Sequence, residues 1–159
     1  MEDILDRNLR GMTEAVRRNE ITSVDLVQGF LDRIEKVNSS LNAVVSINTE
    51  IALKLAAKAD SDLKEGIVHG PLHGIPMTIK DSLDTKDMVT TWGTKGRETF
   101  RPGRDATSVA RLRDAGAILL GKTNTPEFTL SFQTDNLVYG RTNNPYNLDL
   151  IYDETLGHH

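Results

Sequence analysis

Apolar residues recur at helical spacing in three stretches of the first 64 residues. The first stretch predicts a helix whose apolar face is formed by Leu5, Leu9, Met12 and Val16. The second predicts a helix that Thr22 or Ser23 can cap, with an apolar stripe made of Leu26, Val27, Phe30, Leu31 and Ile34. The third predicts a helix over residues 49–64, and Gly66 follows it where a left-handed residue commonly ends a helix.

Three short apolar runs predict β-strands, at residues 43–47, 77–79 and 117–120. Between the second and third runs, Asp105 can cap a helix that carries Val109 and Leu112 and that Gly116 ends. A strand, a crossover helix and a second strand form a βαβ unit. Such a unit implies parallel neighbouring strands whose faces are covered by helices.

These elements predict an α/β chain in three parts. Residues 1–68 form a helical N-terminal arm, and residues 69–150 form part of a mixed, largely parallel β-sheet flanked by helices. Within the second part, Pro126 suits the first turn of a further helix. Residues 133–149 contain four Asn, two Asp and one Pro without a sustained period, which is typical of a surface or binding loop. Residues 151–159 form an atypical tail.

Composition excludes several classes of function. The chain has 159 residues, 19 Lys and Arg, 23 Asp and Glu, and a formal net charge of −4. Nucleic-acid binding needs clustered basic side chains, so no nucleic-acid partner is expected. Without cysteine there is no disulfide, thiolate zinc site or thiol nucleophile. No apolar run approaches the roughly 18 residues that a membrane span needs, so the expected location is the cytoplasm, without a membrane partner.

Lys80 is the side chain with the most chemical interest. It ends the apolar run 75–79, at what should be the C-terminal end of a strand, and in open α/β sheets this end faces the ligand crevice. Burial lowers the pKa of an amine, and a neutral amine can act as a general base. The alternative is that Lys80 only marks the exit of the strand into solvent beside Asp81.

Three other patterns suggest chemistry that their context argues against. His69 and His73 have a metal-ligand spacing, but a proline between them prevents the regular helix that this spacing needs. Residues 116–123 formally match the phosphate-loop pattern G-x-x-x-x-G-K-T, but an apolar strand replaces the flexible loop. Neither Ser82 nor Ser131 lies in a glycine-rich nucleophile elbow. We therefore expect no metal and no organic cofactor.

A series of ordered blocks resembles the amidase signature family. The principal blocks are residues 70–81 (GPLHGIPMTIKD), 90–93 (TTWG), 121–128 (GKTNTPEF) and Tyr139-Gly140 with Asn144-Pro145. Each block alone is weak, whereas together and in this order they are specific. The helical arm also fits this family, so the resemblance extends over roughly residues 5–150.

The resemblance implies a hydrolase that cleaves small-molecule carboxamides through a Ser–cis-Ser–Lys triad. In such enzymes the lysine of the Ile-Lys-Asp block is the general base, which by position is Lys80. It draws a proton, through the cis-serine, from the serine that forms the acyl-enzyme. The segment 125–132 resembles the wall of the acyl pocket in this family, with Thr129, Leu130 and Phe132 as lining residues.

The chain departs from the family pattern after residue 150. The Gly-Gly-Ser-Ser-Gly-Gly type of stretch that supplies the cis-serine, and the later Gly-Gly-Ser turn that supplies the nucleophile, are not found in the 159 residues. We therefore expect an N-terminal portion of such an enzyme, inactive by itself. Two alternatives stay open: a non-catalytic remnant that self-associates or binds a missing C-terminal part, and the amidotransferase subunit that releases ammonia from glutamine for tRNA-bound glutamate together with partner subunits.

Overall fold

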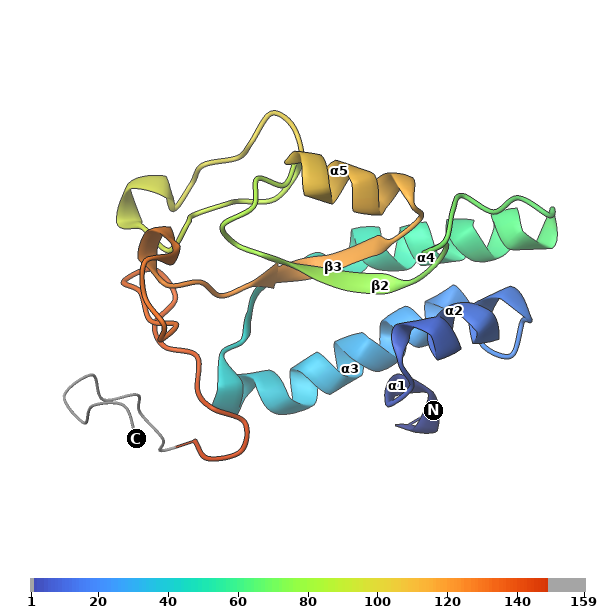
Figure 1. Ribbon diagram of the computed structural model, residues 1–159, viewed down its shortest axis with the longest axis horizontal. Helices are drawn as coiled ribbons and strands as arrows, with labels where there is room; N and C mark the ends of the chain where they lie inside the picture. The colour runs from blue at the N-terminus through green and yellow to red at the C-terminus, as the bar shows by residue number, and fades with distance from the viewer. Residues whose placement is uncertain (1, 149–159) are drawn as a thin grey trace.

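Five α-helices, three strands and two 3₁₀ turns make up residues 2–148, the part of the chain that the computed structural model describes (Figure 1). The helices are α1 (Glu2–Leu5), α2 (Leu9–Arg17), α3 (Ser23–Leu41), α4 (Thr49–Lys64) and α5 (Thr107–Asp114). The strands are β1 (Val44–Ile47), β2 (Pro76–Lys80) and β3 (Ile118–Thr123), and the 3₁₀ turns are η1 (Lys95–Arg97) and η2 (Glu127–Thr129). The tail predicted at residues 151–159 lies outside the described residues.

The three strands form one mixed sheet in the order β1-β3-β2. β2 runs parallel to β3, and α5 lies in the crossover between them, as the predicted βαβ unit requires. β1 runs antiparallel to β3, so the strand of the predicted N-terminal arm shares a sheet with the strands of the predicted second part. This arrangement confirms the predicted α/β class.

Helices cover both faces of the sheet (Figure 1). On one face, α3 and α4 bury a cluster made of Val27, Leu31, Ala52, Ala56, Ala59, Ile118 and Leu120. On the other face, a cluster near α5 consists of Ile79, Met88, Val109 and Leu119. Because β3 is the central strand, its neighbouring side chains go to opposite helical layers, which explains why the run 117–120 is apolar throughout.

Helix starts were predicted correctly only in part. Thr22 caps α3 by accepting a hydrogen bond from Asp25 N–H, as expected. The single predicted first helix is instead divided into α1 and α2, because Asn8 caps α2 through a bond from Gly11 N–H. The predicted cap at Asp105 is wrong: the N-cap of α5 is Ala106, and the Asp105 carboxylate accepts from Lys86 N–H at 2.7 Å.

Gly121 is required by the close approach of β1 to β3. A Cβ atom at this position would lie 2.1 Å from the carbonyl oxygen of Ser46 on β1, well inside van der Waals contact. We expect Gly121→Ala to lower the free energy of unfolding by roughly 2–3 kcal/mol or more, because the two backbones must separate. Urea unfolding measures this change.

Gly103→Ala is the matched control, since a Cβ atom there would meet no heavy atom within 4 Å. It should change the free energy of unfolding by less than about 0.5 kcal/mol. Equal effects of the two substitutions would contradict the importance of the β1–β3 approach.

Candidate functional site

The candidate site lies at the carboxyl ends of β2 and β3. Lys80 is the last residue of β2 and is paired in register with Thr123, the last residue of β3. Parallel strands bring their carboxyl ends to the same edge of a sheet, and open α/β sheets bind ligands outside that edge. The loop after β2 and the segment after β3 start from this edge (Figure 1).

Lys80 is exposed, which matches the alternative that it marks the exit of the strand into solvent, whereas the buried amine that a neutral base needs is not formed by the described residues. Strand alternation places Thr78 and Lys80 on the exposed side of β2 and Ile79 and Asp81 on the buried side. At this end of β2 the described residues leave the Lys80 side chain uncovered. The Lys80 side chain forms no hydrogen bond or ion pair within residues 2–148. The predicted strand position is confirmed, and the predicted burial is not.

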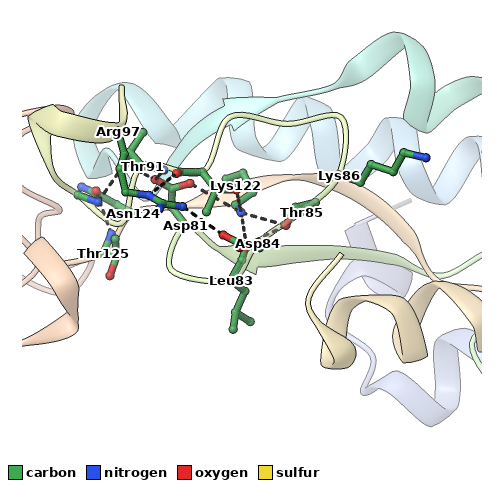
Figure 2. Close-up of polar contacts among 12 residues, drawn as sticks. Asp81, Leu83, Asp84, Thr85, Lys86, Thr91, Arg97, Lys122, Asn124 and Thr125 are labelled. Carbon is green, nitrogen blue, oxygen red and sulfur yellow. Dashed lines mark hydrogen bonds and ion pairs between the residues drawn. The ribbon is translucent and has the colours of Figure 1, made fainter. Parts of the chain in front are cut away.

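Lys122 is the buried lysine of this region, and the sequence patterns missed it. Its side chain has 0% exposed area, and its Nζ donates to Leu83 O at 2.6 Å, Thr85 Oγ1 at 2.9 Å and Thr90 Oγ1 at 3.1 Å (Figure 2). An ammonium group has three N–H donors, and neutral oxygens use all three. Asp81 Oδ1, 3.7 Å away, is therefore an ion-pair partner that receives no hydrogen bond.

Burial moves both charged groups of this pair toward their neutral forms. It lowers the pKa of Lys122 to about 8, against the attraction of the Asp81, Asp84 and Asp105 carboxylates. It also raises the pKa of Asp81, against hydrogen bonds from Thr91 and the charge of Lys122. Lys122 and Asp81 form a buried ion pair at the carboxyl end of the sheet, in which desolvation acts against both charges.

Asp81 connects the end of β2 to the loop at residues 90–93. Its Oδ2 accepts from Thr91 N–H at 3.1 Å and from the Thr91 hydroxyl, and that hydroxyl oxygen accepts from Gly93 N–H at 2.9 Å. Its backbone N–H donates to Thr123 O at 2.8 Å, and its carbonyl accepts from Trp92 N–H at 3.2 Å. The residue after Lys80 is thus held by both its backbone and its side chain.

The helix predicted from Pro126 does not form. Only the 3₁₀ turn η2 follows, because Phe128 and Thr129 adopt left-handed backbone conformations, with φ of +49° and +62°. The predicted pocket residues Thr129, Leu130 and Phe132 are all exposed, with Leu130 at 85% and Phe132 at 92%.

Asparagine side chains organise the irregular segment after β3. Asn124 donates to Gly140 O and to the Thr142 hydroxyl, both at 3.0 Å, and Asn136 donates to Asn124 Oδ1 at 2.8 Å. Asn42, which ends α3, donates to Tyr139 O at 2.7 Å. These bonds attach the predicted loop to the start of the segment after β3 and to α3, and Asn136 is the loop asparagine that takes part in them.

His69, His73 and Ser131 make contacts with residues other than those around Lys80 and Lys122. His73 accepts from His69 N–H through Nδ1, at 3.2 Å, and its Nε2 faces Ala59 O at 3.0 Å. Among residues 2–148, no three His, Asp or Glu side chains are grouped so that they could hold a metal ion. Residues 118–123 of the formal phosphate-loop match form β3. Ser131 Oγ accepts from Gln133 N–H at 3.3 Å.

None of the helices described at residues 2–148 is both long enough and apolar enough to cross a membrane.

Comparison with known proteins matches this chain to an amidase family model, an amide hydrolase and an amidotransferase subunit. A family model described as Amidase matches residues 25–152. The glutamyl-tRNA(Gln) amidotransferase A subunit from Carboxydothermus hydrogenoformans is 37% identical over 140 residues, which cover 88% of this chain and 29% of that protein. Fatty-acid amide hydrolase 2-B of Danio rerio is 41% identical over 147 residues, covering 88% of this chain and 28% of that protein. The chain thus spans 28–29% of the length of these relatives.

A solved structure shares the arrangement of the described elements. Peptide amidase from Stenotrophomonas maltophilia superposes with a TM-score of 0.83 at 36% identity, covering 90% of this chain and 31% of that one. The small mixed sheet with helices on both faces is therefore common to the two proteins.

Proposed function

This chain belongs to the amidase family, and from that premise we propose that it contributes the lysine base of a site that hydrolyses carboxamide C–N bonds. One observation carries the proposal. Lys80 stands in the family's Ile-Lys-Asp block, at the carboxyl end of a strand that is parallel to its neighbour, with its amine free of partners among the described residues. A reacting hydroxyl can therefore approach it.

The chemistry assigned to Lys80 is proton transfer. Its uncharged amine accepts a proton from the bridging cis-serine, which takes one from the nucleophilic serine as that oxygen attacks the amide carbon. The proton is then delivered to the departing nitrogen, and water releases the acyl group. Removal of water around Lys80 is needed for the uncharged form. Residues 2–148 do not provide it, so we assign it to the polypeptide that contributes the two serines.

Substrate binding is assigned to the segment after β3. Thr129, Leu130 and Phe132 present a hydroxyl and two large apolar side chains to the exterior near the carboxyl end of the sheet. Exposed apolar side chains of this size commonly mark a surface that is covered in the working protein. We propose that they form one wall of an acyl pocket for a small-molecule amide, in a protein of the cytoplasm.

The two kinds of relative share the first chemical step. A hydrolase and a component of an amidotransferase match at 41% and 37% identity, so identity does not separate them. Both readings require cleavage of a carboxamide. We therefore propose cleavage of a carboxamide. A strict requirement for tRNA and partner subunits would identify the chain as part of an amidotransferase.

The isolated 159-residue chain is expected to show no amide hydrolysis, because it lacks the Gly- and Ser-rich segments of the family. A fluorophosphonate probe, which labels activated serines, should leave Ser82 and Ser131 unlabelled, as judged by intact mass. Stoichiometric labelling of the chain that Lys80→Ala abolishes would refute this expectation.

A hybrid enzyme tests the proposed function directly. Residues 25–148 of this chain would replace the matching segment of the Stenotrophomonas maltophilia peptide amidase, which is 36% identical to it. The hybrid contains the serines of the recipient and the lysine of this chain. It should release ammonia from a peptide amide, and a folded hybrid without turnover would overturn the proposal.

A further inference from the structure

We propose that Asp81 is a positioning residue that couples the strand of the Lys80 base to the segment 128–132. The inference rests on the proposed function for the roles of Lys80 and of that segment. The coupling itself rests on hydrogen bonds within the described chain. Asp81 directly follows the strand of Lys80, and it reaches the segment 128–132 through one short loop, residues 90–93.

The first step of the coupling is the carboxylate. Asp81 has 0% exposed area, and its Oδ2 holds both the backbone and the hydroxyl of Thr91 (Figure 2). Its other oxygen accepts no hydrogen bond and lies beside the ammonium of Lys122. A buried carboxylate with an unbonded oxygen is costly, and apolar residues of similar volume commonly stabilise such sites better. A contribution to stability therefore does not explain why an aspartate occupies this position, whereas its role in fixing the loop at residues 90–93 does.

The second step is a relay of backbone bonds. Trp92 N–H donates to Asp81 O at 3.2 Å, and Phe128 N–H donates to Trp92 O at 2.9 Å. The Trp92 and Phe128 rings also meet edge to face, with centroids 6.3 Å apart. Two hydrogen bonds thus connect the residue after the base to Phe128, which directly precedes Thr129 of the proposed pocket wall.

The third step is backbone strain where the loop at residues 90–93 meets the segment 128–132. Trp92, Phe128 and Thr129 all have left-handed backbone conformations, with φ of +56°, +49° and +62°. Such conformations in residues other than glycine persist only where surrounding contacts impose them. Gly93 allows the contact, because a Cβ atom there would lie 3.0 Å from Thr125 O and 3.2 Å from Glu127 N. Loss of the Asp81 anchor should release this strain.

Paired threonine variants test the coupling. Thr91→Val removes the hydroxyl that donates to Asp81 and accepts from Gly93 N–H, whereas Thr90→Val removes a hydroxyl that accepts from Lys122 Nζ. Both residues have 0% exposed area and undergo the same chemical change, so Thr90→Val controls for lost stability. Trp92 is the only tryptophan of the chain, so its fluorescence reports on the surroundings of this ring, which include Phe128 and the Arg97 guanidinium.

Thr91→Val should speed hydrogen exchange of the Phe128 amide by about fivefold beyond the change in global stability, and should increase acrylamide quenching of Trp92. Thr90→Val should alter both by less than about twofold, and Thr91→Ser, which keeps the hydroxyl, should restore native values. Equal effects of the two valine variants would overturn the proposal.

The unmodified chain provides a second measurement should Thr91→Val fail to fold. Coupled amides open as one unit, so the Trp92 and Phe128 amides should exchange with the same protection factor within about threefold. Protection of Phe128 that is lower by about a hundredfold would overturn the coupling. Neither measurement needs turnover: an inactive hybrid would refute the proposed function and leave the coupling intact, and unaltered exchange would refute only the coupling.

Discussion

Replacing Lys122 with methionine is expected to lower the free energy of unfolding by roughly 3–5 kcal/mol. Methionine has a similar volume but removes the ammonium, which leaves the Asp81 carboxylate buried without a cation and three oxygens without their donor. Because small domains have total stabilities of about 5–15 kcal/mol, this change is a large share of the total. Urea unfolding, followed by far-ultraviolet circular dichroism and by Trp92 fluorescence, measures it.

A double variant separates the lost pair from lost packing. Lys122→Met with Asp81→Asn removes both charges, so neither is left buried alone. The double variant should be more stable than the sum of the two single effects predicts, by roughly 1–3 kcal/mol. Simple additivity would show that the two charges do not interact.

An exposed ion pair gives the matched control for Lys122. Lys95 Nζ lies 2.9 Å from Glu98 Oε1, and the Lys95 side chain is 58% exposed. Lys95→Met should therefore change the free energy of unfolding by less than about 1 kcal/mol, since solvent screens exposed pairs. A Lys122→Met variant as stable as this control would contradict the buried-pair interpretation.

Local sequence patterns predicted the structure correctly where a single periodic element packs against the core. The 49–64 helix has the predicted bounds, because its small and apolar residues recur on the face that meets β3. The parallel pairing of β2 and β3 followed from strand, helix and strand in sequence, since a crossover of this length imposes it. Thr22 was recognisable as a cap because its partner is only three residues away.

Long-range contacts account for what the patterns missed. Lys122 stands in Gly-Lys-Thr at the end of the formal phosphate-loop match, but the carbonyl and hydroxyls that bind its amine come from residues 83–90. One signal was present: Lys122 directly continues an apolar run into the central strand, where a charge must have partners. The exposure of Lys80 agrees with the alternative that its position beside Asp81 suggested, the exit of the strand into solvent, and the sequence alone did not decide between this alternative and burial.

The structure of the segment after β3 was also predicted wrongly, because contacts with residues distant in sequence determine it. Pro126 predicted a helix, but hydrogen bonds from Asn136 and to Trp92 hold the chain in a different path. Those partners lie 11 or more residues away, beyond the reach of a local pattern. The abundance of Asn was visible, and its meaning depended on which carbonyl groups the fold brings near.

In the hybrid with peptide amidase, Lys80→Ala should lower kcat/KM for a peptide amide by roughly 10²–10⁴-fold, the range attributed to a general acid or base. Lys80→Arg should be as damaging, because a guanidinium group stays protonated and cannot accept a proton. Lys86→Ala is the control, since Lys86 is exposed and its side chain points away from the polar cluster in Figure 2. If Lys80→Arg retained activity, the amine would serve only as a positive charge, and its assignment as the base would be wrong.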